Sequence, residues 1–392
     1  MIKRIPEKFK EANFATGSVG ASDVAESAIH LASADPTAAS DTGSGFVVGS
    51  IWVNTSTGQQ FVATSVSAED ATWYGQEGDI INEPFKIQGS TSGFNYCWSD
   101  PGAYPNVINK LSFTSDGDST DVGESLGGSY ANQGSIRNTT HIYHAGLING
   151  PGVPAAGKAS IWRFAVTSPH VSADVGEHSQ APLSPAIGNW GGTTDGVYGF
   201  THGGQKTDST DFDHIEKFTL ASPAPSSDTS AELSASRHGA VGVSDVSNGY
   251  GYAMGGESWP PTSTKNIIEK YAFASTADGA DVGDLTSARK AGGSFASTSR
   301  AFMAGGAPAP SASNIIDSVP FSSDGNASDW GDLTQARGHM SGCQSTTHGY
   351  QEGGASPSMV DTIDKVSHSS PGNATDVGEA PSSNKGGSMS EI

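Results

Sequence analysis

A short segment of the pattern Ile-x-[Lys/Arg/Ser]-[Phe/Tyr/Leu/Val] recurs six times in the last three quarters of this 392-residue chain. Successive copies lie 47 to 54 residues apart. They begin at Ile108, Ile161, Ile215, Ile268, Ile316 and Ile363. Self-similarity at a near-constant period indicates that each repeat is one small structural unit, which must pack on its neighbours to bury its apolar face. The sequence therefore predicts an array of six similar units.

Two other landmarks recur with the same period. An aspartate lies thirteen residues after each isoleucine, at Asp121, Asp174, Asp228, Asp281, Asp329 and Asp376. A glycine pair precedes the isoleucine in the last four repeats, at Gly203-Gly204, Gly255-Gly256, Gly305-Gly306 and Gly353-Gly354. The distance from the glycine pair to the isoleucine varies, so a loop of adjustable length is expected between them. Glycine there indicates that backbones approach closely near a crowded centre and adopt φ values that other residues avoid.

These landmarks define four short β-segments in each repeat. Four antiparallel strands make one blade of a β-propeller, so the sequence predicts an all-β fold with six four-stranded blades. The expected repeats are residues 86–140, 141–196, 197–249, 250–300, 301–349 and 350–392. Residues 85–92 and 384–392 both occupy the place of a first strand, so one of them should complete a shared blade and remove an exposed sheet edge.

The composition suits such a fold and limits the classes of partner. The chain has 51 glycines, 20 prolines and only 35% apolar residues, as many short strands joined by tight turns require. Its 41 acidic and 20 basic side chains give a formal net charge of -21, which repels phosphate backbones and anionic lipids. We therefore expect neither nucleic-acid binding nor membrane insertion. Cys97 and Cys343 are too few for a disulfide framework or a zinc cluster, and no cofactor is predicted.

Residues 1–84 do not share the repeat and are expected to form a separate element. The segment Gly49–Thr64 (GSIWVNTSTGQQFVAT) has the alternating pattern of a β-hairpin, with strands at 51–54 and 60–64 around a Ser/Thr/Gly turn. A third strand is expected at 71–74, which completes a small module at about residues 46–75. A weak helix is predicted at 23–34.

The repeats resemble the kelch family over residues 86–392. Kelch repeats carry a Gly-Gly pair after apolar residues, a following aromatic position and roughly fifty residues per blade. Family members usually place a Tyr and a Trp after the Gly-Gly pair, whereas this chain has a Ser- and Asp-rich segment there, with only Trp330 near such a place. The resemblance implies a propeller that acts as a binding or structural module.

Two segments are similar to parts of bacteriophage proteins. The hairpin string with Ala71-Thr72-Trp73 resembles a module of phage fibre, tail and head-decoration proteins, and DGNASDWGDL, residues 324–333, looks like repeats in virion-associated proteins of marine and cyanobacterial phages. The resemblance implies a non-enzymatic virion structural protein, present in several copies on the particle surface or tail. Residues 1–84 would bind other virion proteins, and the propeller would belong to a tail, fibre or capsid appendage that contacts a host receptor or glycan.

Several side chains are candidates for binding. Tyr104, Phe212 and Trp259 lie on variable loops, where exposed aromatic rings could stack on glycans. Asp116, Asp118 and Asp121 have a spacing similar to a calcium loop, but Asp-Gly turns recur in nearly every repeat and favour a structural role as hairpin corners. His141, His144 and His202 form a weaker metal hypothesis.

The role of three repeated arginines and two other functions of the protein are left open as alternatives. Arg237, Arg289 and Arg337 precede the aromatic strand of three repeats and either face a central channel, where they would bind an anion, or pair with acids such as Asp284 and Asp332. No catalytic residue is predicted, because the acids follow the repeat period. The alternative functions are a glycan-active enzyme on a propeller scaffold and a cellular kelch-type interaction module.

Overall fold

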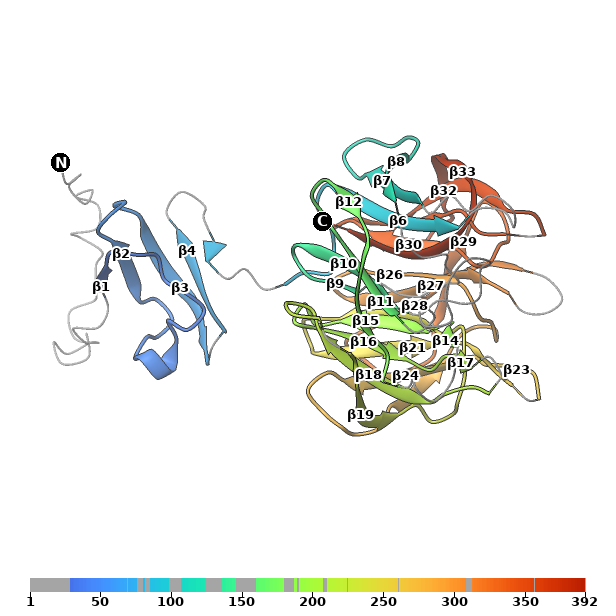
Figure 1. Ribbon diagram of the computed structural model, residues 1–392, viewed down its shortest axis with the longest axis horizontal. Helices are drawn as coiled ribbons and strands as arrows, with labels where there is room; N and C mark the ends of the chain where they lie inside the picture. The colour runs from blue at the N-terminus through green and yellow to red at the C-terminus, as the bar shows by residue number, and fades with distance from the viewer. Residues whose placement is uncertain are drawn as a thin grey trace. The chain divides into compact units, whose positions relative to one another are not determined.

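The protein is described here by a computed structural model, in which the chain divides into two compact units, Met1–Pro84 and Phe85–Ile392 (Figure 1). The structure describes residues 29–68, 70–75, 80–81, 85–98, 107–124, 136–145, 160–179, 187–188, 190–206, 210–223, 225–259, 261–307, 312–355 and 357–391. Strands dominate both units, which confirms the predicted all-β class. In the described ranges no helix has the length and apolar character needed to cross a bilayer.

The first unit is a five-stranded sheet in the order β1-β2-β3-β4-β5. Its strands are β1 (Ile29–Ala32), β2 (Ile51–Asn54), β3 (Gln60–Ser67), β4 (Asp70–Gly75) and β5 (Ile80–Ile81). The predicted hairpin and third strand are confirmed, and Phe61 and Trp73 lie in the core between them. The helix predicted at 23–34 is wrong over its described part, because β1 pairs in parallel with β2; residues 23–28 lie outside the described ranges.

The second to fifth sheets of the second unit each have four antiparallel strands side by side in chain order. The first strand of each sheet lies at the end of the preceding expected range, so the repeats that form the sheets begin earlier than expected, near residues 136, 191, 241 and 293. The second sheet comprises β9 (Ile136–Arg137), β10 (His141–Ala145), β11 (Ser160–Ala165) and β13 (Ala173–Glu177). The third comprises β15 (Gly191–Thr194), β16 (Tyr198–His202), β18 (His214–Thr219) and β19 (Ser227–Glu232). The fourth comprises β20 (Val241–Asp245), β21 (Tyr250–Met254), β24 (Ile267–Ala272) and β25 (Ala280–Asp284). The fifth comprises β26 (Gly293–Ala296), β27 (Arg300–Gly306), β28 (Ser313–Pro320) and β29 (Ser328–Asp332).

The first and sixth repeats share one long strand, β33 (Thr375–Glu391). Its first part pairs with β32 and forms the last strand of the sixth sheet, whereas Lys385–Glu391 pairs with β6 and forms the first strand of the first sheet. The first strand of each sheet is called its inner strand, and the last its outer strand. The other strands are β6 (Ser92–Trp98), β7 (Val107–Ser112), β8 (Thr120–Glu124), β30 (Ser341–Gln344), β31 (His348–Glu352) and β32 (Val360–Ser367). The expectation that one chain end completes a sheet is therefore confirmed for the C-terminal end.

Short strand pairs accompany the main sheets. They are β12 (His170–Val171) on β8, β14 (Ile187–Gly188) with β17 (Gln205–Lys206), and β22 (Glu257–Ser258) with β23 (Ser263–Thr264).

The inner strands of the sheets contact one another in sequence order. β9 lies beside β15, β15 beside β20, β20 beside β26, and β26 beside β30; β30 lies beside β33, and β33 lies beside β9. Residues 85–89 pack among these strands, where Ile87 is buried against Val241 and Val243. The side chain of Gln344 donates to the Ile87 carbonyl oxygen at 3.3 Å, so this segment is held by several repeats at once.

A hydrogen bond of one kind joins the outer edge of each repeat to the next. A backbone N–H in the turn before the outer strand donates to the carbonyl oxygen at the end of the previous outer strand, at 2.7 to 3.1 Å. The donor and acceptor pairs are Ser172 and Glu124, Ser226 and Glu177, Gly279 and Glu232, Ala327 and Asp284, Ala374 and Asp332, and Ser119 and Glu379. The last pair joins the sixth repeat to the first.

The recurring aspartates shape the outer strand. Each accepts a hydrogen bond from the backbone N–H two residues further on, at 2.7 to 3.2 Å. The donors are Gly123, Gly176, Ser230, Gly283, Gly331 and Gly378. This local bond is an Asx-type turn, and it accounts for the constant position of the aspartate in every repeat.

The glycine pairs join neighbouring sheets. Gly255 and Gly256 have φ values of 67° and 106°, and the N–H of Gly256 donates to the Arg289 carbonyl oxygen at 3.0 Å. A Cβ on Gly255 would lie 2.3 Å from that same oxygen, so a side chain is excluded. Because Arg289 begins the next repeat, the glycine pair allows two repeats to meet.

Candidate functional site

The three predicted surface aromatics have different outcomes. Tyr104 lies outside the described residues. Phe212 is only 4% exposed, so its assignment to an exposed surface is wrong. Its ring stacks on Trp190, which lies in the connection between β14 and β15 and covers it. Trp259 is 45% exposed, in the turn that follows β22.

The predicted calcium group is not assembled. Asp116 pairs with Lys365 at 2.8 Å, Asp118 accepts from the N–H of Glu379 at 3.0 Å, and Asp121 accepts from the N–H of Gly123 at 3.2 Å. Within the described ranges their carboxylates do not form a set that could share an ion. Each acid has its own structural partner, as the hairpin-corner interpretation requires.

The three repeated arginines are fully buried and paired with acids. Arg289 lies 2.9 Å from Asp317, Arg337 lies 2.9 Å from Asp364, and Arg237 pairs with Glu269. The predicted partners, Asp284 and Asp332, are wrong; the true partner directly follows the isoleucine of the third strand in the same repeat. Burial lowers the pKa of each arginine, and the adjacent acid opposes that shift.

A histidine takes the place of the arginine in the third sheet. Glu216 is fully buried, with His178 Nδ1 3.0 Å away and hydrogen bonds from Ser179 and Ser226. Burial alone would raise the pKa of Glu216, but these contacts outweigh it and lower the pKa to about 2. These buried pairs serve the scaffold, because they recur from repeat to repeat and are closed to solvent.

Polar groups that do not follow the period are better candidates for function. One such cluster, the 211–290 cluster, comprises Asp211, His238, Glu257 and Lys290. His238 Nδ1 lies 2.9 Å from Asp211, His238 Nε2 lies 3.6 Å from Glu257, and Lys290 pairs with Glu257. These residues come from the third, fourth and fifth repeats.

The 211–290 cluster also fixes the loop that presents Trp259. The backbone N–H of Trp259 donates to Asp211 at 2.6 Å. In the sixth repeat, the positions that match His238 and Glu257 are Gly338 and Ala355, which form the same backbone bridge without polar side chains. The matching bridge of the sixth repeat thus lacks these polar side chains, whereas the 211–290 cluster holds an exposed indole in a defined position.

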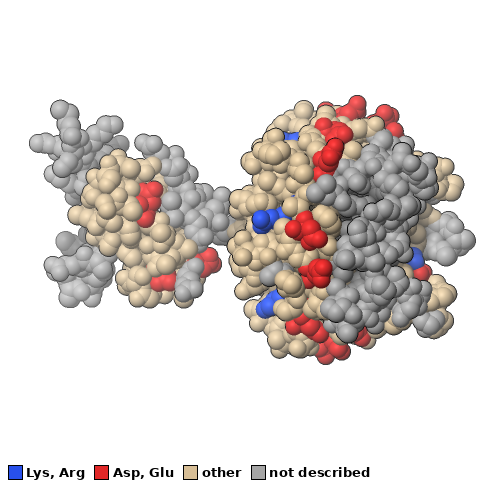
Figure 2. Space-filling view, viewed as in Figure 1, with Lys and Arg blue, Asp and Glu red and all other residues tan. Residues whose placement is uncertain are grey.

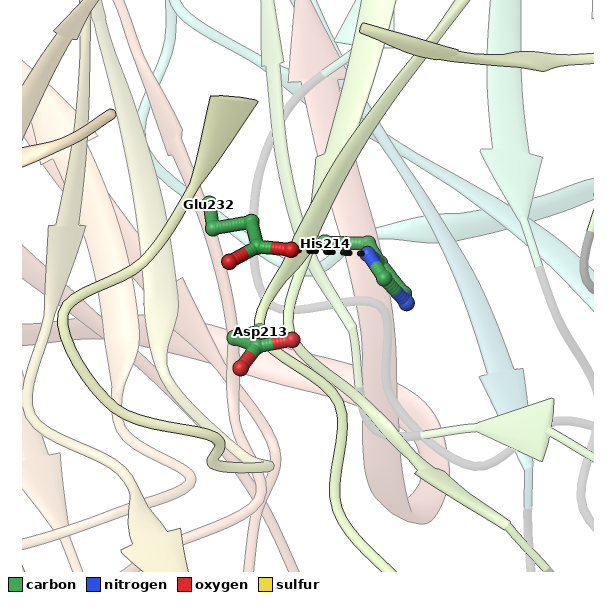
Figure 3. A group of neighbouring side chains, drawn as sticks. All are labelled: Asp213, His214 and Glu232. Atoms are coloured by element: carbon green, nitrogen blue, oxygen red, sulfur yellow. Dashed lines mark ion pairs between the residues drawn. The ribbon is translucent and has the colours of Figure 1, made fainter. Parts of the chain in front are cut away.

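A second non-periodic group lies at the start of β18. Asp213, His214 and Glu232 each offer one ligand atom, and these atoms lie within 4.8 Å of one another (Figure 3). His214 Nδ1 is 3.9 Å from Glu232 and 3.7 Å from Asp228. It is the one such group of three or more ligating side chains in the described part of the chain.

Sequence reasoning missed this group because it searched for residues that the repeats share. Asp213-His214 replaces Asn266-Ile267 and Asn314-Ile315 of the next two repeats, and that difference was visible in the sequence. The histidines that were considered instead are not brought together. Burial lowers the pKa of both His144 and His202 to about 3, so each is a neutral core side chain.

The charge of the surface agrees with the composition. Among the coloured residues of Figure 2, acidic side chains outnumber basic ones on the visible face.

No protein-family model matches the chain, and no curated protein is similar to it in sequence.

Proposed function

We propose that the protein is a non-enzymatic structural component of a bacteriophage particle, in which the first unit binds other virion proteins and the second unit is a six-bladed propeller. The two phage-like segments, the hairpin of the first unit and DGNASDWGDL of the fifth repeat, support the particle assignment. The strands of that hairpin pair as its residue pattern predicts.

The circular order of contacts supports six blades. Six equivalent hydrogen bonds link consecutive repeats, and the bond from Ser119 to Glu379 returns the series to its beginning. The inner strands contact one another in the same circular order. β33 forms the outer strand of the sixth sheet and then the inner strand of the first, so one continuous strand joins the two ends of the second unit, which favours a closed ring over an open array.

The two ends of the strands differ in a way that suits attachment and display. Phe85, at the start of the second unit, packs near Gly196 in the turn between β15 and β16. Trp259 lies in the loop between β21 and β24, at the opposite end of the strands. Phe85 and Trp259 therefore lie at opposite ends of the strands of the second unit, and the end that carries Trp259 is the proposed contact surface.

Labelling of purified particles tests the assignment. Antibodies raised against residues 85–392 should decorate intact virions at a regular position in electron micrographs, and mass spectrometry should find several copies per particle. A protein lacking residues 1–84 should fold but fail to join the particle. If the full-length protein is absent from particles purified from infected cells, the proposal is wrong.

Competition for adsorption tests the proposed contact with host glycans. Free wild-type protein should slow adsorption of particles to host cells, whereas Trp259→Ala should compete at least tenfold less well, because aromatic stacking is lost. Trp330→Phe serves as the control, since Trp330 is a core side chain. Release of free sugar from the cells would instead support the glycan-active enzyme.

A further inference from the structure

We propose that Asp213, His214 and Glu232 bind a divalent transition-metal ion of the zinc type. This inference does not depend on the proposed place in a virion. Imidazole nitrogen with two carboxylate oxygens is a ligand set that suits Zn²⁺ and related first-row ions, with water completing the coordination.

The Nδ1 atom of His214 is shielded from solvent although a quarter of the side chain, 26%, is exposed. It has no hydrogen-bond partner. The nearest carboxylate oxygens, on Asp228 and Glu232, are 3.7 and 3.9 Å away, too far for a hydrogen bond. Two ligands of a tetrahedral ion with bonds near 2.1 Å lie about 3.4 Å apart. The 3.9 Å from His214 Nδ1 to Glu232, and the separations within 4.8 Å among the three ligand atoms, would therefore have to shorten when an ion binds.

The backbone of the group is fixed by the sheet. His214, at the start of β18, and Glu232, at the end of β19, are direct cross-strand partners. The Asp213 carbonyl oxygen accepts from the N–H of Leu233 at 2.7 Å, and its carboxylate accepts from Ser236 at 3.1 Å. The sheet therefore fixes the backbone positions of all three residues before any ion binds. Figure 3 shows their side chains converging.

The other repeats provide an internal comparison. The cross-strand partner of the acid that matches Glu232 is Val107, Ser160, Ile267, Ile315 or Thr362. None of these side chains is a usual ligand for a transition metal. The acid alone is thus part of the repeat, whereas the histidine is an addition to one repeat.

A change in the outer strand accompanies the histidine. The third repeat has six residues from Asp228 to Leu233, where the fourth has five from Asp281 to Leu285. The extra residue lengthens β19, and Ser230 takes φ 65°. The histidine and the inserted residue therefore coincide at a single point, beside an aspartate that the sixth repeat also has, and a purely architectural role does not require that coincidence.

Calorimetric titration of the untagged full-length protein, freed of metal by a chelator, tests the site. Zn²⁺ should bind wild type at one site. His214→Ile and Asp213→Asn, which restore the residues of the fourth repeat, should each weaken binding at least tenfold. Asp361→Asn is the matched control, because Asp361 holds the equivalent place beside Thr362 in the sixth repeat and should leave binding unchanged.

A gain of binding gives an independent test that a folding defect cannot imitate. Thr362→His should create a second site in the sixth repeat, between Asp361 and Glu379, and raise the stoichiometry from one Zn²⁺ to two. Co²⁺ should give visible absorption bands in wild type that His214→Ile abolishes. Absence of Zn²⁺ binding to wild type, or equal binding by the folded His214→Ile variant, would overturn the inference.

Discussion

The backbone N–H of Ser119 in the first repeat donates to the carbonyl oxygen of Glu379 in the sixth, at 3.0 Å. Residues from opposite ends of the second unit thus make the same bond that joins every other pair of neighbouring repeats. Beside it, Asp118 accepts from the N–H of Glu379. Asn326 and Asn373 make the matching side-chain bond at two other junctions.

The Asp118 bond predicts a difference between two substitutions. Asp118→Asn should leave the free energy of unfolding nearly unchanged, because asparagine already serves at two junctions. Asp118→Ala should lower it by about 1 kcal/mol, the usual value of a hydrogen bond of this kind. Urea denaturation with and without Ca²⁺ measures both variants. A large effect of Ca²⁺ that Asp118→Ala removes would contradict the structural role of this aspartate.

The buried pair of Arg289 and Asp317 predicts a large effect. Asp317→Asn leaves a buried guanidinium without its counter-charge and should lower the free energy of unfolding by about 3 to 5 kcal/mol. The control is Asp324→Asn, which removes the half-exposed partner of Lys270 and should cost less than about 1 kcal/mol. Denaturant titrations compare the two, and similar effects would contradict the assigned burial.

Ser230 predicts a stabilising substitution. It occupies, at φ 65°, a position where the other five repeats have glycine. Ser230→Gly should raise the free energy of unfolding by about 1 kcal/mol, since a left-handed backbone is strained for serine. The converse change, Gly283→Ala, should destabilise, because a Cβ there would lie 2.2 Å from the Gly325 carbonyl oxygen. Thermal unfolding checks the opposite signs, and two shifts of equal sign would refute this interpretation.

Glu216 predicts a defined pH dependence. Contacts with His178 and two serines lower its pKa from the ordinary 4.5 to about 2 despite burial. A carboxyl with a depressed folded pKa stabilises the protein fully above the unfolded value and loses that contribution as pH falls through the folded value. Between pH 4.5 and 2 the wild type should lose about 3 kcal/mol that Glu216→Gln does not lose. Unfolding free energies measured across this range test the difference, and parallel curves would contradict it.

The repeated features of the fold were accessible from the sequence. The constant interval to Asp121 and its equivalents predicts a shared structural role, and the Asx-type turns explain it. The end of β33 was likewise predictable, because residues 384–392 match the first strand of a repeat. Such features follow from local chemistry repeated at a fixed period, which a single sequence displays directly.

Contacts between distant segments were harder to predict. Arg289 was expected to pair with Asp284 nearby, but Asp317 is its partner because strand order brings β28 beside the start of the repeat. Phe212 was expected on the surface, yet Trp190 covers it. Burial and pairing of this kind depend on register and on neighbouring repeats, which residue types alone do not specify.

Amide hydrogen exchange at the six junction donors tests the circular arrangement most directly. The N–H groups of the five sequential junctions act as internal standards for the sixth, that of Ser119. If the repeats close on themselves, Ser119 should exchange as slowly as its five equivalents. Exchange of Ser119 at the rate of an unprotected amide, with the other five protected, would show an open array and contradict the account.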